Sequence, residues 1–258
     1  MTKVFDDATR AGCAAEQVGP GPGTEIVATA AVTRGPADDP RGPVRSRDYD
    51  LPGFVESRFS PLVHEAAQLC LGKPGASHAD DWRESTAMLL VGTFGDAVTA
   101  DTASTRLLAG LVHNPLLFYQ SVPTSVLGHL AREYGITGEI SCLSVDRDVC
   151  APALAAAELI LHDGDMRQVL VIGVELAATP RTAPAYRSAQ LPYLTAPRHD
   201  VAAAVLLRST DPTVPTVDRT PAGLPAPVEF GSLNELVRLC TGASRRVPAA
   251  TPPATKEN

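Results

Sequence analysis

Five short apolar runs, separated by stretches with helical periodicity, constrain the fold of this chain more than any other feature. They span residues 25–32, 88–94, 140–145, 169–174 and 201–207. Near-continuous apolar runs such as MLLVGTF are typical of strands that are buried on both faces. The helical stretches between them are long enough to serve as crossover connections between parallel strands. The sequence therefore predicts an α/β fold with a mainly parallel five-stranded sheet flanked by helices.

Start and stop signals predict where the helices lie. Ser60-Pro61 combines an N-cap serine with a proline at the first helical position, and Gly72 follows the last apolar residue of that helix. The other predicted helices are residues 103–112, a segment from Ser121 to before Gly135, an Ala-rich segment that begins near Asp148 with Pro152 in its first turn, and residues 232–240.

These elements divide the chain into three parts. Residues 24–210 are predicted to form one domain, preceded by a flexible N-terminal segment at residues 1–23. Residues 211–258 form a Pro-rich tail, because the prolines between 211 and 227 exclude a regular helix there. The short amphipathic helix at 232–240 is the structured part expected within this tail.

Charge and hydropathy exclude several classes of partner. The chain has 22 basic and 29 acidic residues, a net charge of −7, and no long basic run, which argues against nucleic acid as a partner. Its apolar runs are too short to span a bilayer, so no membrane association is predicted. Residues 1–18 lack the apolar core of a secretory signal, and a cytoplasmic location is expected.

The distribution of cysteine, histidine and lysine predicts neither a metal nor a cofactor. The five cysteines contain no CxxC pair, the six histidines no HExxH pattern, and the chain has few lysines for Schiff-base chemistry. His64 lies beside an apolar helical stripe and is expected to be half exposed. His129 is predicted to be a helix residue with a hydrogen-bond partner rather than a catalytic base.

The run at 140–145 leads directly into a polar elbow, Ser144-Val145-Asp146-Arg147-Asp148, which precedes the Ala-rich helix. Around this elbow the chain resembles the amino-terminal half of a β-ketoacyl synthase, an enzyme of the thiolase fold, over residues 55–209. The resemblance implies a thiolase-like half domain. The matching segments are the helix at 59–71, MLLVGTF, NPLLFYQSVPTSVLGHLAREYGITGE, the elbow, AAAELIL, VLVIGVE and DVAAAVLL.

The elbow departs from the pattern of the condensing members of that family. Those members carry a nucleophilic cysteine there in a Thr-Ala-Cys type sequence, at a helix N-terminus that lowers the thiol pKa. Counting back from the Ala-rich helix places Asp146 at that position, whereas counting forward from Gly138 places Arg147 there. Asp146 and Asp148 suit helix capping. Cys150 is the alternative nucleophile, about one turn late, and burial against the sheet is favoured for it.

A second departure concerns the carboxy-terminal half that supplies catalytic histidines and a lysine in complete ketosynthases, because residues 211–258 show no counterpart. The resemblance therefore implies a subunit that is not catalytic alone. Such a subunit, like a chain length factor, pairs with a complete β-ketoacyl-ACP synthase in type II polyketide, aryl-polyene or fatty-acid-like biosynthesis. It shapes the acyl tunnel and helps seat an acyl carrier protein, whose phosphopantetheine arm is a partner group. The expected tunnel or interface residues are Phe118, Ser121, Val122, Asp146, Arg147, Asp148, Tyr186 and Tyr193.

Two alternatives remain open from the sequence. The first is an enzyme, either an acyltransferase or condensing enzyme that uses Cys150, or a hydrolase that uses Asp146. The second is a structural relic that folds as a homodimer and has no acyl chemistry. A half domain exposes apolar surface, so an obligate partner is the physical expectation for the subunit that pairs with a complete ketosynthase.

Overall fold

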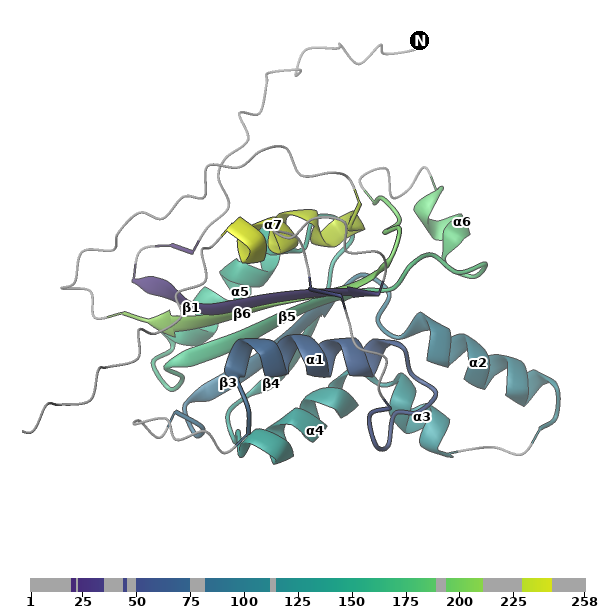
Figure 1. The fold of residues 1–258 in the computed structure, drawn as a ribbon, viewed down its shortest axis with the longest axis horizontal. Coiled ribbons are helices and arrows are strands. Elements are labelled where there is room, and N and C mark those ends of the chain that lie inside the picture. The colour runs from purple at the N-terminus through teal and green to yellow at the C-terminus, as the bar shows by residue number, and fades with distance from the viewer. Residues whose placement is uncertain are drawn as a thin grey trace, which may run out of the picture.

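The computed structural model describes residues 20–21, 23–34, 44–45, 50–74, 82–111, 115–188, 194–210 and 229–242. One central sheet lies between two layers of helices (Figure 1). The strands are β1 (Thr24–Arg34), β2 (Val44–Arg45), β3 (Thr86–Gly92), β4 (Ile140–Ser144), β5 (Gln168–Glu175) and β6 (Asp200–Ser209). The helices are α1 (Phe59–Leu71), α2 (Ala97–Leu108), α3 (Pro115–Ser121), α4 (Pro123–Tyr134), α5 (Cys150–His162), α6 (Ala183–Tyr186), the 3-10 turn η1 (Gly231–Leu233) and α7 (Asn234–Gly242).

The five predicted strands all form, together with the two-residue strand β2, in the order β2-β1-β6-β5-β3-β4. The predicted fold class is confirmed, with the refinement that the sheet is mixed rather than purely parallel, because one described strand, β6, runs opposite to the others. β3 pairs in parallel with β4 and β5, whereas β6 is antiparallel to both of its neighbours, β5 and β1. Antiparallel neighbours need no crossover helix. Within the described residues, the connection from β5 to β6 holds only the single turn of α6.

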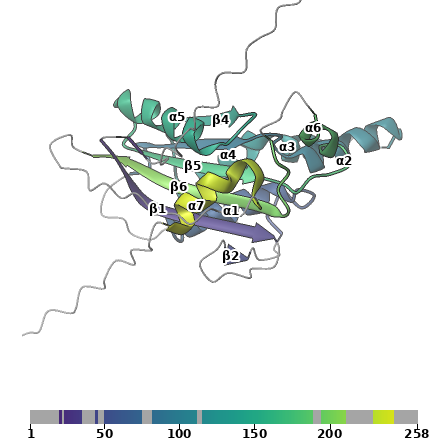
Figure 2. The same ribbon diagram turned by 90° about the horizontal axis from the view of Figure 1, so that it is seen from above.

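Alternate side chains of the central strands point into two separate cores. On β6, Ala202 and Ala204 pack in the core beneath α1 and α4, while Val201 and Val205 pack in the core beneath α5 and α7. Figures 1 and 2 show these helix pairs on opposite faces of the sheet. Because β6 is buried on both faces, its sequence does not alternate between apolar and polar residues.

Three sequence expectations differ from the structure in detail. β4 was expected to be buried, but it is an edge strand with alternating exposed residues. The helix expected at 103–112 begins earlier, at Ala97, because the Asp96 side chain accepts a hydrogen bond from the Thr99 backbone N–H at 3.0 Å and caps it. His64 is 6% exposed rather than half exposed, because its ring lies between α1 and α4, with Nε2 2.6 Å from Glu133 Oε2 on α4.

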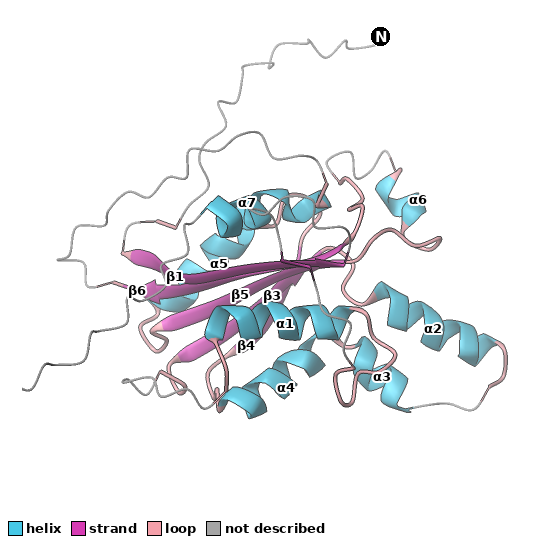
Figure 3. Cartoon of the chain, viewed as in Figure 1, coloured by secondary structure: helices cyan, strands magenta, loops and turns pink. Residues whose placement is uncertain are grey.

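A helix forms near the expected residues 232–240, as η1 and α7, and it packs on β1, β5 and β6 as part of the core rather than as a separate tail (Figure 3). Gly173 on β5 permits this close packing, since a Cβ at that position would lie 2.5 Å from side-chain atoms of Leu233 and Leu236. Most of the expected flexible segment 1–23, Tyr193 and the tail outside 229–242 lie outside the described residues. Among the described helices, none has both the length and the apolar content that a bilayer crossing requires.

Candidate functional site at the β4–α5 elbow

The elbow, residues 144–148, runs from the last residue of β4 toward the start of α5. The Val145 N–H donates to the Gly92 carbonyl at 3.1 Å, which extends the β3–β4 pairing by one residue. Because β3 and β4 are parallel, their carboxyl ends meet at the same edge of the sheet. The loop that follows β3, with Thr93 and Phe94, therefore lies beside the elbow.

Asp146 and Arg147 form the outer side of the elbow. Their side chains are 61% and 67% exposed, and Arg147 Nε lies 3.1 Å from Asp146 Oδ1. Both residues line an open surface pocket of about 410 Å³. The other lining residues are Thr93, Phe94, Ser144, Val145, Pro152 and Leu194. The position that corresponds to the nucleophile in the sequence comparison is thus the wall of a mostly apolar pocket.

Asp148 is half buried and joins the starts of two helices. Its Oδ1 accepts a hydrogen bond from the Cys150 N–H at 2.9 Å, and its carboxylate also accepts from the Glu235 backbone N–H at the start of α7. Burial raises the pKa of Asp148, and these backbone hydrogen bonds counteract that rise. Of the two aspartates that the sequence suggested as caps, Asp148 makes these contacts, whereas Asp146 pairs with Arg147.

Cys150 is the first residue of α5 and points into the core between α5 and the sheet. Its side chain is 0% exposed and does not line the pocket. Burial raises the pKa of the Cys150 thiol to about 12, and the negative charges of Asp148 and Glu235 act in the same direction. The thiol is therefore protonated at neutral pH, which removes the nucleophilic form that acyl transfer requires.

Glu175 is a buried carboxylate that the sequence reasoning did not single out. It ends β5 and is 3% exposed, and its Oε1 accepts hydrogen bonds from the Thr93 N–H at 2.7 Å and the Ser232 hydroxyl at 2.8 Å. Burial raises its pKa, and the hydrogen bonds counteract that rise. The available signal was a charged residue at the end of an otherwise apolar strand, VLVIGVE. Glu175 ties the loop after β3 to η1 directly behind the elbow.

Tyr186 lies on α6 near the same end of the sheet. Its hydroxyl is 3.4 Å from Glu175 Oε2, and its ring meets the Phe94 ring edge-on, with centroids 5.1 Å apart. These three residues line a small cavity of about 10 Å³, which is about the room that one water molecule needs. Phe94 lines both this cavity and the larger pocket. Phe94 therefore lies between Tyr186 and the pocket that Asp146 and Arg147 line.

Phe118, Ser121 and Val122 lie elsewhere, on α3 and at the start of α4. The Phe118 side chain is 67% exposed, and the Ser121 hydroxyl donates to the Phe118 carbonyl at 2.8 Å. None of the three lines the two pockets described above. Phe118 is one of several exposed apolar side chains on α2, on α3 and just after α2; the others are Leu107, Leu108, Leu111, Leu116 and Tyr119.

No family model and no curated protein matches the sequence, but many solved structures match the fold. A ketosynthase (ApeO) in complex with its chain length factor (ApeC) from Xenorhabdus doucetiae aligns with a TM-score of 0.59 at 18% identity, over 85% of this chain and 90% of that chain. The ishigamide ketosynthase/chain length factor aligns with a TM-score of 0.57 at 14% identity, over 80% of this chain and 64% of that chain.

A third similar structure is AntDE:AntF, a type II PKS acyl-carrier protein in complex with its ketosynthase bound to the hexaketide. It aligns with a TM-score of 0.53 at 13% identity, over 72% of this chain and 62% of that chain. These similarities show that the chain has a ketosynthase-like, thiolase-type fold, as the sequence resemblance implied. The chain spans less than two thirds of the second and third of these structures.

Proposed function

We propose that this protein is a ketosynthase-like subunit without a nucleophile of its own, which pairs with a complete β-ketoacyl-ACP synthase in the manner of a chain length factor. The observation that carries the proposal is the elbow. Asp146 and Arg147 are exposed where a condensing enzyme holds its thiol, and the nearby thiol of Cys150 is buried with a raised pKa.

The residues that line the pocket suit the wall of an acyl tunnel better than an active centre. Among its lining residues in the described part of the chain, Asp146 is the one carboxylate, and there is neither a histidine nor a lysine. General acid–base catalysis needs a positioned proton donor or acceptor close to the reacting group. The charge of Asp146 is opposed by Arg147 at 3.1 Å, so this arrangement gives little support to a hydrolase.

Edge strand β4 offers a route for pairing with another subunit. Within the described residues β4 pairs only with β3, and its side chains alternate between exposed and half-buried positions. An edge strand presents backbone N–H and C=O groups that can pair with another strand. Ile140 on β4 and Leu159 on α5 add exposed apolar side chains, at 38% and 69% exposure.

In this arrangement the pocket at the elbow forms part of an acyl tunnel that the two subunits share. The apolar residues Phe94, Pro152 and Leu194 suit a growing acyl chain. An acyl carrier protein is the third partner, and its phosphopantetheine arm delivers the chain to the nucleophile of the complete ketosynthase. Arg147, on the rim, supplies a cation that suits the phosphate of that arm.

Co-purification with a co-encoded ketosynthase and acyl-loaded carrier protein tests the proposal. We expect a heterodimer by size-exclusion chromatography with light scattering, and intact-mass analysis should find acyl groups transferred to the ketosynthase and none on this chain. Substitutions that narrow the pocket, such as Pro152→Phe, should shorten the product. Acylation of this chain by itself that disappears in Cys150→Ala, but persists in the control Cys142→Ala, would overturn the proposal. A stable homodimer without any effect on product length would also overturn it.

A further inference from the structure

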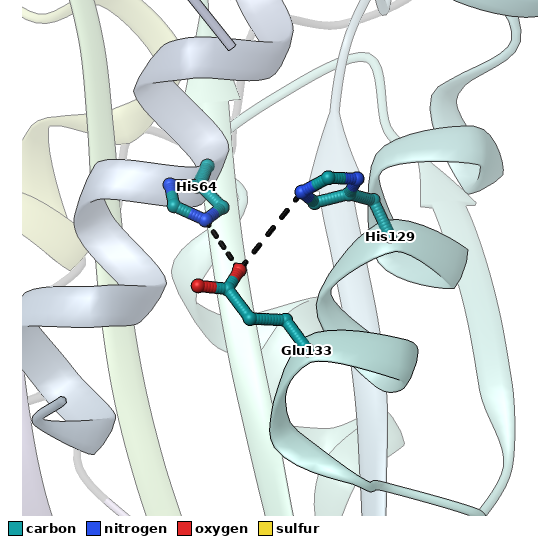
Figure 4. A group of neighbouring side chains, drawn as sticks. All are labelled: His64, His129 and Glu133. Atoms are coloured by element: carbon teal, nitrogen blue, oxygen red, sulfur yellow. Dashed lines mark hydrogen bonds and ion pairs between the residues drawn. The ribbon is translucent and has the colours of Figure 1, made fainter. Parts of the chain in front are cut away.

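A cluster of three potential metal ligands lies between α1 and α4, away from the elbow. His64 belongs to α1, and His129 and Glu133 are one turn apart on α4 (Figure 4). Glu133 Oε2 lies 2.6 Å from His64 Nε2 and 4.0 Å from His129 Nε2. One donor atom from each residue falls within 4.8 Å of the other two.

We propose that His64, His129 and Glu133 form a binding site for a divalent transition metal, with Zn²⁺ as the preferred ion. Two imidazoles and one carboxylate are a ligand set that suits zinc with a fourth position open to water. Hard ions such as Mg²⁺ and Ca²⁺ prefer all-oxygen sites and are a poor match for two histidines.

The donor atoms need only small movements to reach zinc geometry. Zinc–nitrogen and zinc–oxygen bonds of about 2.0–2.2 Å place neighbouring ligand atoms of a tetrahedron roughly 3.4 Å apart. The observed separations of 2.6 Å and 4.0 Å lie on either side of this value, each within about 1 Å of it. Rotation of the Glu133 carboxylate, whose side chain is 28% exposed, changes both separations.

The surroundings hold the cluster in place from both helices. The Tyr134 hydroxyl donates to the Gly72 carbonyl at 2.8 Å and joins the end of α4 to the end of α1. The Phe54 ring meets the His129 ring edge-on, with centroids 5.8 Å apart, and restricts its rotation. An apolar, ordered shell of this kind orients ligands and limits competition from water.

Access and burial fit a bound ion with one water ligand. His64 is nearly covered, with a side chain 8% exposed, while the side chains of His129 and Glu133 are 17% and 28% exposed. An ion can therefore enter from the side of α4. The pockets described above are lined by other residues, so the site suits a structural ion that links α1 to α4 more than a second catalytic centre.

The metal takes the place of a proton. His64 Nε2 and Glu133 Oε2 lie at hydrogen-bond distance, 2.6 Å. On metal binding the His64 ring keeps its proton on Nδ1, which leaves Nε2 as the ligand atom, and one oxygen of Glu133 and one ring nitrogen of His129 turn to the same ion. The inference is independent of the pairing proposed above, because its three residues come from α1 and α4 and none of them lines the pocket at the elbow.

The test uses the full chain without an affinity tag, stripped of metal and titrated with Co²⁺ and then Zn²⁺. We expect one equivalent of Co²⁺ to bind with the visible absorption of a four-coordinate site, and Zn²⁺ to displace it. Zn²⁺ at about 100 times its Kd should raise the Tm by about 5–10 °C. His129→Gln and Glu133→Gln should each lower the affinity for Zn²⁺ by more than about 100-fold. This exceeds the roughly 10–100-fold loss that follows when a residue hydrogen-bonded to a ligand, rather than the ligand itself, is replaced.

Two control variants replace potential metal ligands that lie outside the proposed site. His162→Gln, at the end of α5, and Cys142→Ala, on β4, should leave the affinity and the cobalt spectrum unchanged. His129 and Glu133 are partly exposed, so their variants are expected to fold, and circular dichroism of the metal-free proteins verifies it. Absence of stoichiometric binding would overturn the inference. Binding that survives both His129→Gln and Glu133→Gln, or that disappears in either control, would do the same.

Discussion

The β4–α5 elbow has polar side chains on both of its sides, but those on the inner side are buried and those on the outer side are exposed to solvent. On the inner side, Glu175 is 3% exposed and accepts hydrogen bonds from two segments, and Cys150 is fully buried. On the outer side, Asp146 and Arg147 are mostly exposed and pair with each other at the rim of the pocket. Buried polar groups that keep their partners maintain a structure, whereas exposed groups at a pocket are available to another molecule.

This difference predicts where substitutions cost stability. A buried acceptor that is removed leaves its donors without partners and without water, and each such donor costs free energy. An exposed ion pair contributes little, because solvent replaces its interactions. Changes inside the elbow should therefore lower the free energy of unfolding, while changes outside it should alter the interaction with a partner.

The largest effect is expected for Glu175→Ala. The Thr93 N–H and the Ser232 hydroxyl would lose their common acceptor, so we expect a loss of about 2–4 kcal/mol in the free energy of unfolding. Urea denaturation monitored by circular dichroism measures it. Asp163→Ala, an exposed carboxylate just after α5, is the matched control and should cause almost no change. A loss in Glu175→Ala no larger than in that control would remove the distinction between the two sides.

Glu175 also predicts how stability depends on pH. Its pKa in the folded protein is raised above the ordinary value of 4.5, so the folded state holds a proton that the unfolded state releases. This contribution is fully present below pH 4.5 and is lost as the pH rises through the raised pKa. The free energy of unfolding of the wild type, relative to Glu175→Gln, should fall across this window by at most about 1.4 kcal/mol per pH unit. A constant difference between the two proteins from pH 4 to 8 would argue against a raised pKa.

A smaller effect is expected for the cap at Asp148. Asp148→Ala removes the acceptor for the Cys150 N–H and for the Glu235 N–H, which should cost about 1–2 kcal/mol. Asp148→Asn keeps an acceptor oxygen and should cost much less, since asparagine is also a good helix cap. Thermal unfolding of both variants, side by side, measures the comparison. Equal losses in the two variants would show that the capping contact does not matter.

The sequence predicted the helices and strands near the elbow well, but it predicted poorly how they pair and which residues contact one another. The five strands followed from apolar runs, and the cap at Asp148 followed from its place before an Ala-rich helix, because both depend on local patterns. The antiparallel direction of β6 did not follow, since a strand buried on both faces has the same composition in either direction.

Contacts between residues that are far apart in the sequence were also missed. Glu175 meets Ser232 across 57 positions in the chain, and His64 meets Glu133 across 69. No local motif contains either pair, so only the folded structure brings them together. The same reason explains why a chain without an HExxH or CxxC pattern can still bring three potential metal ligands together.

Substitutions on the outer side of the elbow are expected to change the stability least. They should also give the most informative functional result. Asp146→Ala combined with Arg147→Ala removes an ion pair whose members are 61% and 67% exposed, so the free energy of unfolding should stay within about 0.5 kcal/mol of the wild type. Because both side chains line the pocket, the double variant should still change the product length or the rate of the assembled complex. Chemical denaturation and product analysis by mass spectrometry on the same preparation measure the two quantities. A double variant that is destabilised but makes unchanged products would contradict this distinction. The outer ion pair would then stabilise the fold, and the pocket would not affect the product.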